Sequence, residues 1–357
     1  MFKQKAPVDA LTAKYEAQKI AFAPMVFQTA KAMVDLKILD HLALVGDAGA
    51  EVKEIAQKTG LSEYAVEVLL ESGLSAKIVY LIDNDRFGLT NVGTFLLRDE
   101  MTRVNMNFVN DVCYQGMVHL QAALLEGKPL GLKAMGEWKT IYEALASLPP
   151  KVKESWFAFD HFYSDIAFHA LLPMVFEHHP LTLMDIGANT GKWSLECLAY
   201  NPEVHIIAVD LPGQLHVAKQ NIDAAGFAER VTFLPANMLE GPSLGHGVDL
   251  IWMSQFLCCF SPTEITAIFE SAKDALHEDG VICVLDTFWD CQRFEASAFS
   301  LHNTSLYFTV MANANSKMYH SRVIRECAES VGLHCVLQKD EIGVAHTLMK
   351  FEKKMSE

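Results

Sequence analysis

The sequence predicts an α/β protein in which a doubly wound, mostly parallel sheet follows a mainly helical N-terminal domain. Three observations support this prediction. Strand-like apolar runs alternate with amphipathic helical segments from residue 181 onward, a glycine-rich turn at residues 187–191 follows the first such run, and helical periodicity dominates the first 100 residues. Strands that alternate with helices are typical of parallel sheets covered by helices on both faces.

Residues 1–100 are predicted to form a winged-helix-like dimerisation domain. Residues 52–74 read as two short amphipathic helices, with Ser62 placed to cap the second, and residues 77–91 read as two short strands that form the wing. The second helix carries three carboxylates at spacing four, which places them on one face: Glu63, Glu67 and Glu71. Such a face would repel DNA phosphates, so we interpret this domain as a scaffold for dimerisation.

Residues 101–180 are predicted to be a helical linker that also contributes to a substrate pocket. The stretch "ESWFAFDHFYSDIAFHALLPMVFEHH" is rich in aromatic residues at helical spacing. Most such aromatics pack in a core, and others line a pocket.

Residues 181–357 are predicted to be the catalytic α/β domain. The strand-like runs are residues 181–187, 204–212, 231–238, 247–257 and 281–289, followed by 333–341 and 346–353. The helical segments between them are residues 191–202, 213–226, 262–280 and 320–332, and we expect Gly280 to close the third. In such sheets ligands bind at the carboxyl ends of the strands, and residues 187–191 lie at such an end.

Composition narrows the classes of function. The 357 residues carry a formal net charge of −15, which disfavours nucleic acid as a partner. The amino terminus lacks the apolar block of a signal peptide, and no run reaches the ~18 uncharged apolar residues of a membrane span. Eight cysteines are scattered without a CxxC pair. We therefore expect a cytoplasmic protein with reduced thiols that contacts neither membrane nor nucleic acid.

The turn "LMDIGANTGKWSLE" distinguishes three classes of nucleotide ligand. A phosphate-binding P-loop needs four residues between its glycines and a hydroxyl after the lysine, whereas Gly187 and Gly191 enclose three residues and Trp193 follows the lysine. A dinucleotide fingerprint needs a middle glycine, which this turn lacks. What remains is an acid, Asp185, before the turn and a second acid, Asp210, that ends the next strand and can bind ribose hydroxyls. Acids suit the cationic ligand S-adenosylmethionine.

These motifs resemble those of the class I S-adenosylmethionine-dependent methyltransferases, which have a Rossmann-like sheet. The chain is specifically similar to the small-molecule O-methyltransferases that carry an N-terminal winged-helix dimerisation domain. "LMDIGANTG" resembles their glycine-rich motif, "AVDLP" their ribose motif, and "ANM" a motif that flanks adenine. The resemblance implies a homodimer that uses S-adenosyl-L-methionine, and it implies these cofactor-binding residues: Asp185, Gly187, Gly191, Asp210, Leu211, Asn237, Met238, Ser254 and Phe260.

The chain departs from the family at its catalytic base. Cys258 falls where the family has a histidine, and Asp286 falls where it has the partner glutamate. A thiol is a weak base at neutral pH unless its pKa falls, and a nearby carboxylate raises that pKa. The other candidates for the base are His161 and His302. The resemblance implies that the helix with "FDHFYSD" contributes Phe159 and Tyr163 to the substrate pocket, and Asn303 is expected to orient the substrate. The acidic and histidine residues lack metal-ligand spacing, so we expect no metal.

The predicted activity is methyl transfer from S-adenosylmethionine to a small, apolar, aromatic or polyketide-like acceptor, with O-methylation favoured. The replaced histidine keeps a second hypothesis open, namely a relative that binds S-adenosylmethionine without methylating. The sequence leaves open the acceptor, the receiving atom and the identity of the base.

Overall fold

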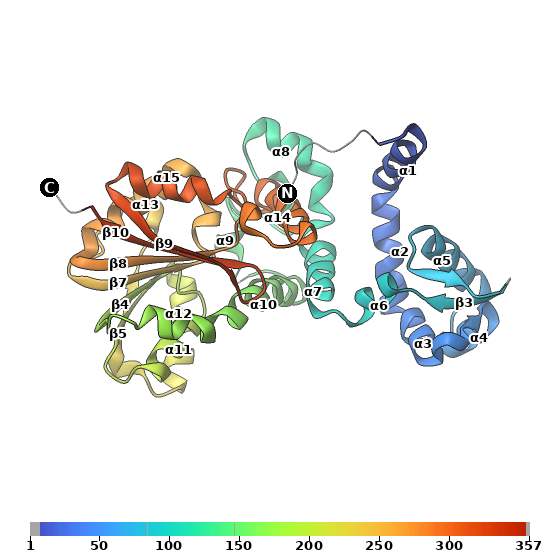
Figure 1. Ribbon diagram of the computed structural model, residues 1–357, viewed down its shortest axis with the longest axis horizontal. Helices are drawn as coiled ribbons and strands as arrows, with labels where there is room; N and C mark the ends of the chain where they lie inside the picture. The colour runs from blue at the N-terminus through green and yellow to red at the C-terminus, as the bar shows by residue number, and fades with distance from the viewer. Residues whose placement is uncertain (1–7, 84, 146, 355–357) are drawn as a thin grey trace. The chain divides into compact units, whose positions relative to one another are not determined.

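The computed structural model describes residues 8–83, 85–145 and 147–354, with Asp165 described by its backbone alone. The chain forms two compact units, residues 2–107 and residues 108–357 (Figure 1). The division falls inside helix α7 (Glu100–Phe108), a little after the boundary proposed at residue 100.

The N-terminal unit is mainly helical with a small antiparallel sheet. Its helices before α7 are α1 (Ala10–Ala21), α2 (Ala23–Asp35), α3 (Ile38–Val45), α4 (Val52–Thr59), α5 (Glu63–Ser75) and α6 (Asn91–Arg98). Its strands are β1 (Ala50–Glu51), β2 (Val79–Leu81) and β3 (Arg86–Leu89), in the order β1-β3-β2. The predicted helix pair is α4 and α5, and Ser62 Oγ accepts a hydrogen bond from Ala65 N at 3.2 Å, which confirms the predicted cap.

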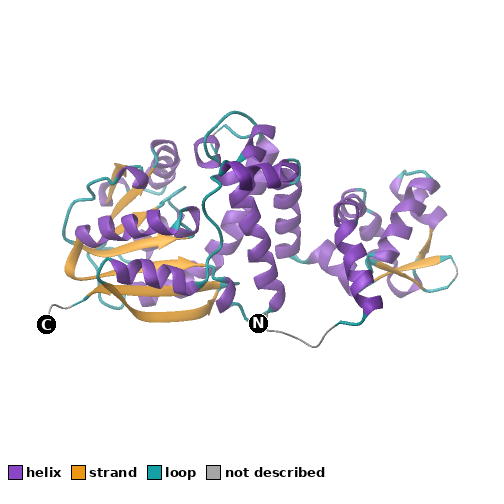
Figure 2. Cartoon of the chain, turned by 90° about the horizontal axis from the view of Figure 1, so that it is seen from above, coloured by secondary structure: helices purple, strands orange, loops and turns teal. Residues whose placement is uncertain are grey.

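The first part of the second unit is helical, as predicted. After a π-helical segment at Val109–Cys113 come α8 (Leu120–Glu126), α9 (Ile141–Ala144) and the long α10 (Pro150–Val175). These helices pack with α14 (Glu295–Tyr307) around a buried cluster that includes Phe108, Tyr307 and Met311. Figure 2 shows this group of helices next to the strand-rich part of the chain.

The rest of the second unit is built on a seven-stranded sheet in the order β6-β5-β4-β7-β8-β10-β9. The strands are β4 (Thr182–Ile186), β5 (His205–Asp210), β6 (Val231–Pro235), β7 (Val248–Ser254), β8 (Leu276–Asp286), β9 (Leu333–Ile342) and β10 (His346–Lys353). Neighbours from β6 to β8 pair in parallel, whereas β10 is antiparallel to both β8 and β9. The predicted doubly wound, mostly parallel sheet is confirmed.

Helices cover both faces of this sheet because successive strand residues point to opposite sides. Met184 and Ile186 belong to a core with α13 (Pro262–Ala275) and α15 (Ser321–Ser330). Leu183 instead packs with the end of α10, with α11 (Lys192–Tyr200) and with α12 (Pro212–Ala224). In Figure 1, α13 and α15 lie above the sheet and α11 and α12 lie below it. The strands thus carry two apolar faces, as their continuous hydrophobic runs indicate.

One predicted boundary is wrong. The helix expected to run to Gly280 ends at Ala275, and β8 begins at Leu276, which is extended and pairs with Val248. Leu276 is buried there, so packing of its side chain draws the chain out of the helix. Gly280 lies inside β8, where an added Cβ would come within 2.9 Å of Val248 O.

Candidate active site

A cavity of about 430 Å³ lies at the carboxyl ends of the parallel strands. It extends from the turn after β4 to the helical part of the same unit, and residues of α9, α10 and α14 line its far end. Most of the residues predicted to bind the cofactor line this cavity: Asp185, Gly187, Asp210, Leu211, Asn237, Met238, Ser254 and Phe260.

The two glycines of the turn have different roles. Gly187 lines the cavity in the left-handed region at φ +82°, and an added Cβ there would lie 2.5 Å from the Phe256 ring. Gly191, at φ +79°, begins α11 but is not among the lining residues, and a Cβ there would press on Ala218 and Ile222 of α12. The turn therefore leaves its backbone open to a ligand at residue 187 and packs against a helix at residue 191.

Asp210 ends β5 with its carboxylate held by the main chain. One oxygen accepts a hydrogen bond from Asn189 N at 2.8 Å, and the other accepts one from Leu211 N at 2.7 Å. Burial raises the pKa of Asp210, and these two hydrogen bonds oppose the rise. The carboxylate is thus fixed in orientation and keeps lone pairs for a ligand.

Asp185 lies deeper, at 2% exposure, and accepts a hydrogen bond from Ser194 Oγ at 2.7 Å. Burial raises the pKa of Asp185 to about 7, and the nearby Asp210 adds to the rise. A cation bound in the cavity would favour the ionised form of both acids.

Three side chains that line the cavity have buried polar atoms with no hydrogen-bond partner among the described residues: Tyr142 Oη, Trp193 Nε1 and Ser254 Oγ. Trp193 stands in the first turn of α11 and Ser254 ends β7, so both flank the glycine turn. Buried donors without partners are costly unless a ligand or water satisfies them. Together with the open backbone at Gly187, they fit a ligand that carries both charge and hydrogen-bonding groups.

The side chain of Asn237 is less available to a ligand than expected, because both of its polar atoms form hydrogen bonds within the chain. Its Oδ1 accepts from Leu239 N at 3.1 Å and its Nδ2 donates to Glu240 Oε1 at 3.0 Å. The amide therefore caps the short helix that starts at Met238, which itself is buried against the cavity.

Aromatic side chains form the far end of the cavity, and they include Phe108, Tyr142, Trp156, Phe159, Tyr307 and Phe308. Phe159 lies stacked on Phe108 with ring centroids 4.0 Å apart. Tyr163 is not among the lining residues, because it packs edge-on behind Phe159 at 5.2 Å. Phe159 thus faces the cavity, and Tyr163 supports it.

Cys258 lines the cavity at 5% exposure, but its thiol is not suited to accept a proton. Sγ donates to Gln255 O at 3.4 Å, and the neighbouring Cys259 thiol, together with burial and Asp286, raises the pKa of Cys258 well above its ordinary value.

Asp286 does not line the cavity. Its carboxylate accepts from Cys258 N at 3.3 Å and from Thr287 N at 2.8 Å, and burial raises its pKa to about 7. Asp286 therefore positions the loop after β7.

The two histidine candidates lie in different places. His161 lines the cavity, and its Nε2 is 3.9 Å from Asp160 Oδ2. His302 and Asn303 are exposed on α14 and do not line the cavity. The His302 ring lies 4.9 Å from that of Trp289, and Asn303 Nδ2 donates to its own helix. The structure therefore brings His161 to the site and leaves the α14 pair outside it.

Comparison with known proteins agrees with this geometry. Residues 14–87 match the Dimerisation2-like domain family, and residues 183–280 match a methyltransferase domain family. The second match covers β4 to the middle of β8, including the glycine turn and Asp210. Residues 183–280 thus carry a methyltransferase domain, and the relatives that the chain matches along most of its length are S-adenosylmethionine-dependent methyltransferases. The cofactor of the chain is therefore S-adenosylmethionine.

The relatives of this methyltransferase are distant but span most of its length. L-tyrosine C(3)-methyltransferase of Streptomyces lavendulae is 22% identical over 88% of this chain and 85% of its own. 3-Hydroxy-5-methyl-1-naphthoate 3-O-methyltransferase of Streptomyces sahachiroi is 24% identical over 74% of each chain. Among solved structures, the S-adenosylmethionine-dependent methyltransferase SibL superposes with a TM-score of 0.71 at 20% identity, covering 94% of this chain and 98% of its own. These structural likenesses support the fold.

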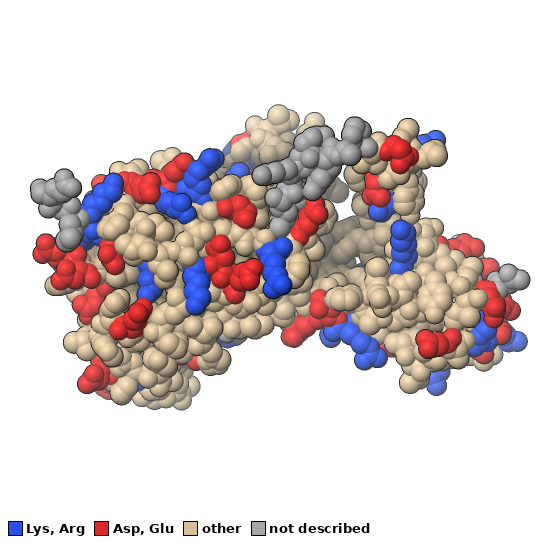
Figure 3. All heavy atoms as spheres, viewed as in Figure 1, with Lys and Arg blue, Asp and Glu red and all other residues tan. Residues whose placement is uncertain are grey.

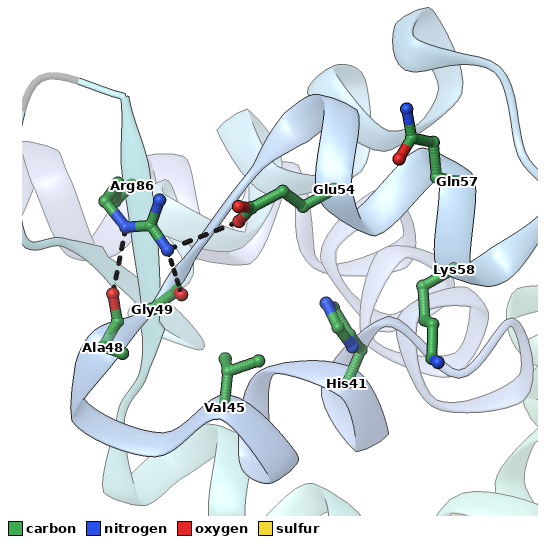
Figure 4. Close-up of a pocket in the computed structure, with 8 residues that line it drawn as sticks. All are labelled: His41, Val45, Ala48, Gly49, Glu54, Gln57, Lys58 and Arg86. Carbon is green, nitrogen blue, oxygen red and sulfur yellow. Dashed lines mark hydrogen bonds and ion pairs between the residues drawn. The ribbon is translucent and has the colours of Figure 1, made fainter.

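The N-terminal unit of the methyltransferase has a hollow of its own, of about 410 Å³ (Figure 4). Arg86 lies at its edge, donating from Nε to Ala48 O at 3.0 Å and from a terminal nitrogen to Gly49 O at 2.7 Å. It also forms an ion pair with Glu54 at 3.3 Å. The guanidinium thus connects β3 to the turn before β1 and to α4. Its hydrogen bonds and ion pair are therefore made within the fold.

The surface, the side-chain clusters and the helices add three observations. On the face shown in Figure 3, Lys and Arg side chains are interspersed with Asp and Glu. Within the described part of the methyltransferase, no group of three or more His, Cys, Asp or Glu side chains is arranged to hold a metal ion. None of the described helices combines the length and apolarity needed to cross a membrane.

Proposed function

We propose that this methyltransferase methylates a small, largely apolar acceptor of aromatic or polyketide-like structure, most favourably on oxygen. The observation that supports this most is one continuous cavity. At one end are Asp185, Asp210 and the Gly187 backbone, and at the other is a wall of aromatic rings. A planar acceptor fits against such rings by stacking.

The residues around the glycine turn are proposed to hold the cofactor. The Asp210 carboxylate accepts hydrogen bonds from the ribose hydroxyls, and Asp185 lies where it favours a cation. Ser254 Oγ and Trp193 Nε1 offer hydrogen bonds to the amino-acid part. When bound, S-adenosylmethionine supplies a methyl group whose bond to sulfur breaks, with the electron pair left on sulfur, as the acceptor oxygen bonds to the methyl carbon.

The protein's main contribution is alignment in a water-poor cavity. The acceptor hydroxyl must also lose its proton, and Cys258 is protonated at neutral pH. We propose that His161, the candidate histidine that lines the cavity, accepts this proton. Acidic phenols lose this proton most readily, so their methylation depends least on His161.

We also propose that the methyltransferase is a homodimer formed through its N-terminal unit. The match to the Dimerisation2-like family supports this, as do exposed apolar side chains on α1 such as Leu11 and Ile20. Light scattering on the intact chain should give twice the chain mass of 39.7 kDa. A monomer at micromolar concentration would contradict the proposal.

The activity is tested by incubating the protein with isotope-labelled S-adenosylmethionine and a panel of naphthols, hydroxyquinones and acidic phenols. Mass spectrometry should detect a gain of one methyl group on oxygen, and His161→Ala should lower the rate with little change in cofactor affinity. Cofactor binding without methyl transfer to any member of the panel would favour a non-methylating role.

A further inference from the structure

The far end of the cavity contains a hydroxyl that the fold does not use. Tyr142, on the short helix α9, lines the cavity, and its Oη is buried without a hydrogen-bond partner in the described parts of the chain. Its main-chain oxygen accepts from Gln214 Nε2 at 3.5 Å, and Gln214 also lines the cavity, just after Asp210. This hydrogen bond holds the main chain at Tyr142 against α12, the helix that follows Asp210.

The neighbouring polar groups are already paired with one another. The thiols of Cys258 and Cys259 both donate to Gln255 O, at 3.4 and 3.9 Å. Tyr307 Oη accepts from Trp156 Nε1 at 2.8 Å. The Tyr142 hydroxyl lies beside the Cys259 thiol, which is a weak hydrogen-bond acceptor, so the phenol proton remains available to a stronger acceptor on a ligand.

The charge around the cavity limits which ligand can meet this hydroxyl. Its acidic lining residues are Glu143, Asp160, Asp185, Asp210 and Glu264. Lys192 is the single Lys or Arg among the described residues that line the cavity. It lies at the start of α11, beside the cofactor turn. At the aromatic end of the cavity, a carboxylate-bearing acceptor would therefore lack a described Lys or Arg side chain to compensate its desolvation.

We propose that Tyr142 determines acceptor specificity by donating a hydrogen bond to a carbonyl oxygen of an uncharged, planar aromatic acceptor. This inference rests on the proposed function and deepens it, because it names the acceptor class. A buried donor of this kind binds an acceptor that presents the matching oxygen and rejects an analogue without it, since the hydroxyl would otherwise stay unpaired.

A matched pair of probes tests this inference. 7-Hydroxychroman-4-one and chroman-7-ol are bicyclic phenols of similar size that differ in the carbonyl, and both are uncharged at about pH 6, where they are compared. Calorimetry is performed on protein saturated with S-adenosylhomocysteine. The native protein should bind the carbonyl probe about tenfold more tightly than its partner. In Tyr142→Phe the preference should vanish, while the affinity for chroman-7-ol stays within about twofold. A carboxylated analogue of the carbonyl probe, 7-hydroxy-4-oxochroman-2-carboxylate, should bind about tenfold more weakly than the carbonyl probe.

Tyr319→Phe is the matched control. The Tyr319 hydroxyl donates to Phe260 O at 2.7 Å and does not line the cavity. This variant should keep the carbonyl preference and melt at a lower temperature. Tyr142→Phe should melt no lower than the native protein, because it loses a hydroxyl that has no partner.

The outcomes separate this inference from the proposed function. A native protein that shows no preference for the carbonyl probe, including one that binds neither probe, overturns the role of Tyr142, as does a preference that persists in Tyr142→Phe. Neither measurement requires methyl transfer. A Tyr142-dependent preference in a protein that methylates nothing would overturn the proposed function alone.

Discussion

Replacement of Asp210 by alanine should nearly abolish cofactor binding. The carboxylate is buried, and its orientation is set by Asn189 N at 2.8 Å and Leu211 N at 2.7 Å. If it accepts one hydrogen bond from each ribose hydroxyl, each bond to the charged group contributes about 1.5–3 kcal/mol. The sum of about 3–6 kcal/mol corresponds to roughly 10²- to 10⁴-fold in Kd.

Isothermal titration with S-adenosylhomocysteine measures this loss directly. Asp249→Ala is a suitable control, because Asp249 also accepts main-chain hydrogen bonds, from Leu181 N at 3.0 Å and Thr182 N at 2.9 Å, but near the starts of β4 and β7. It should lower the melting temperature and leave Kd unchanged. An Asp210→Ala variant that folds and binds within about threefold of the native protein would refute the assignment of this carboxylate to the ribose.

Three further predictions concern the same cavity. Because the pKa of Asp185 is raised from 3.8 to about 7, the folded state holds its proton across that range, so the stability of the ligand-free protein should fall as pH rises from about 4 to about 7. This shift corresponds to at most ~4 kcal/mol, and the fall in melting temperature should be smaller in Asp185→Asn. Cys258→Ala should leave kcat within about twofold between pH 7 and 9, whereas His161→Ala should lower it by at least about 100-fold in the labelled methyl-transfer assay; equal losses would refute these roles. Gly187→Ala should displace the Phe256 ring and weaken cofactor binding by more than about tenfold in calorimetry, and an unchanged Kd would contradict the tight turn.

The strands and the cofactor end could be predicted because their signals are local. Buried parallel strands require continuous apolar runs, and a tight turn beside a ligand requires a glycine such as Gly187. Asp210 could be found because the end of a strand fixes where a side chain lies. The boundary between α13 and β8 could not be predicted, since it depends on the burial of Leu276 beside Val248, a contact between distant segments.

The acceptor end was harder to predict because it depends on the rotation of helices. On α14, His302 and Asn303 are exposed, whereas the next residue, Thr304, lines the cavity. Successive side chains of a helix point in directions about 100° apart. An error of one residue in the predicted orientation of a helix therefore moves a side chain from the cavity to solvent. Tyr142 lies on a four-residue helix that has no periodic signal, and its burial comes from neighbours far along the chain.

The position of β10 has a consequence for truncated forms of the enzyme. β10 is interior, between β8 and the edge strand β9, although it follows both in the chain. β9 pairs with β10 and with no other described strand, so deletion of everything after Ile342 would detach β9 as well and leave five strands ending at an unprotected β8. Such an open edge invites pairing with other molecules, and the shortened enzyme should therefore aggregate rather than remain as a smaller folded domain.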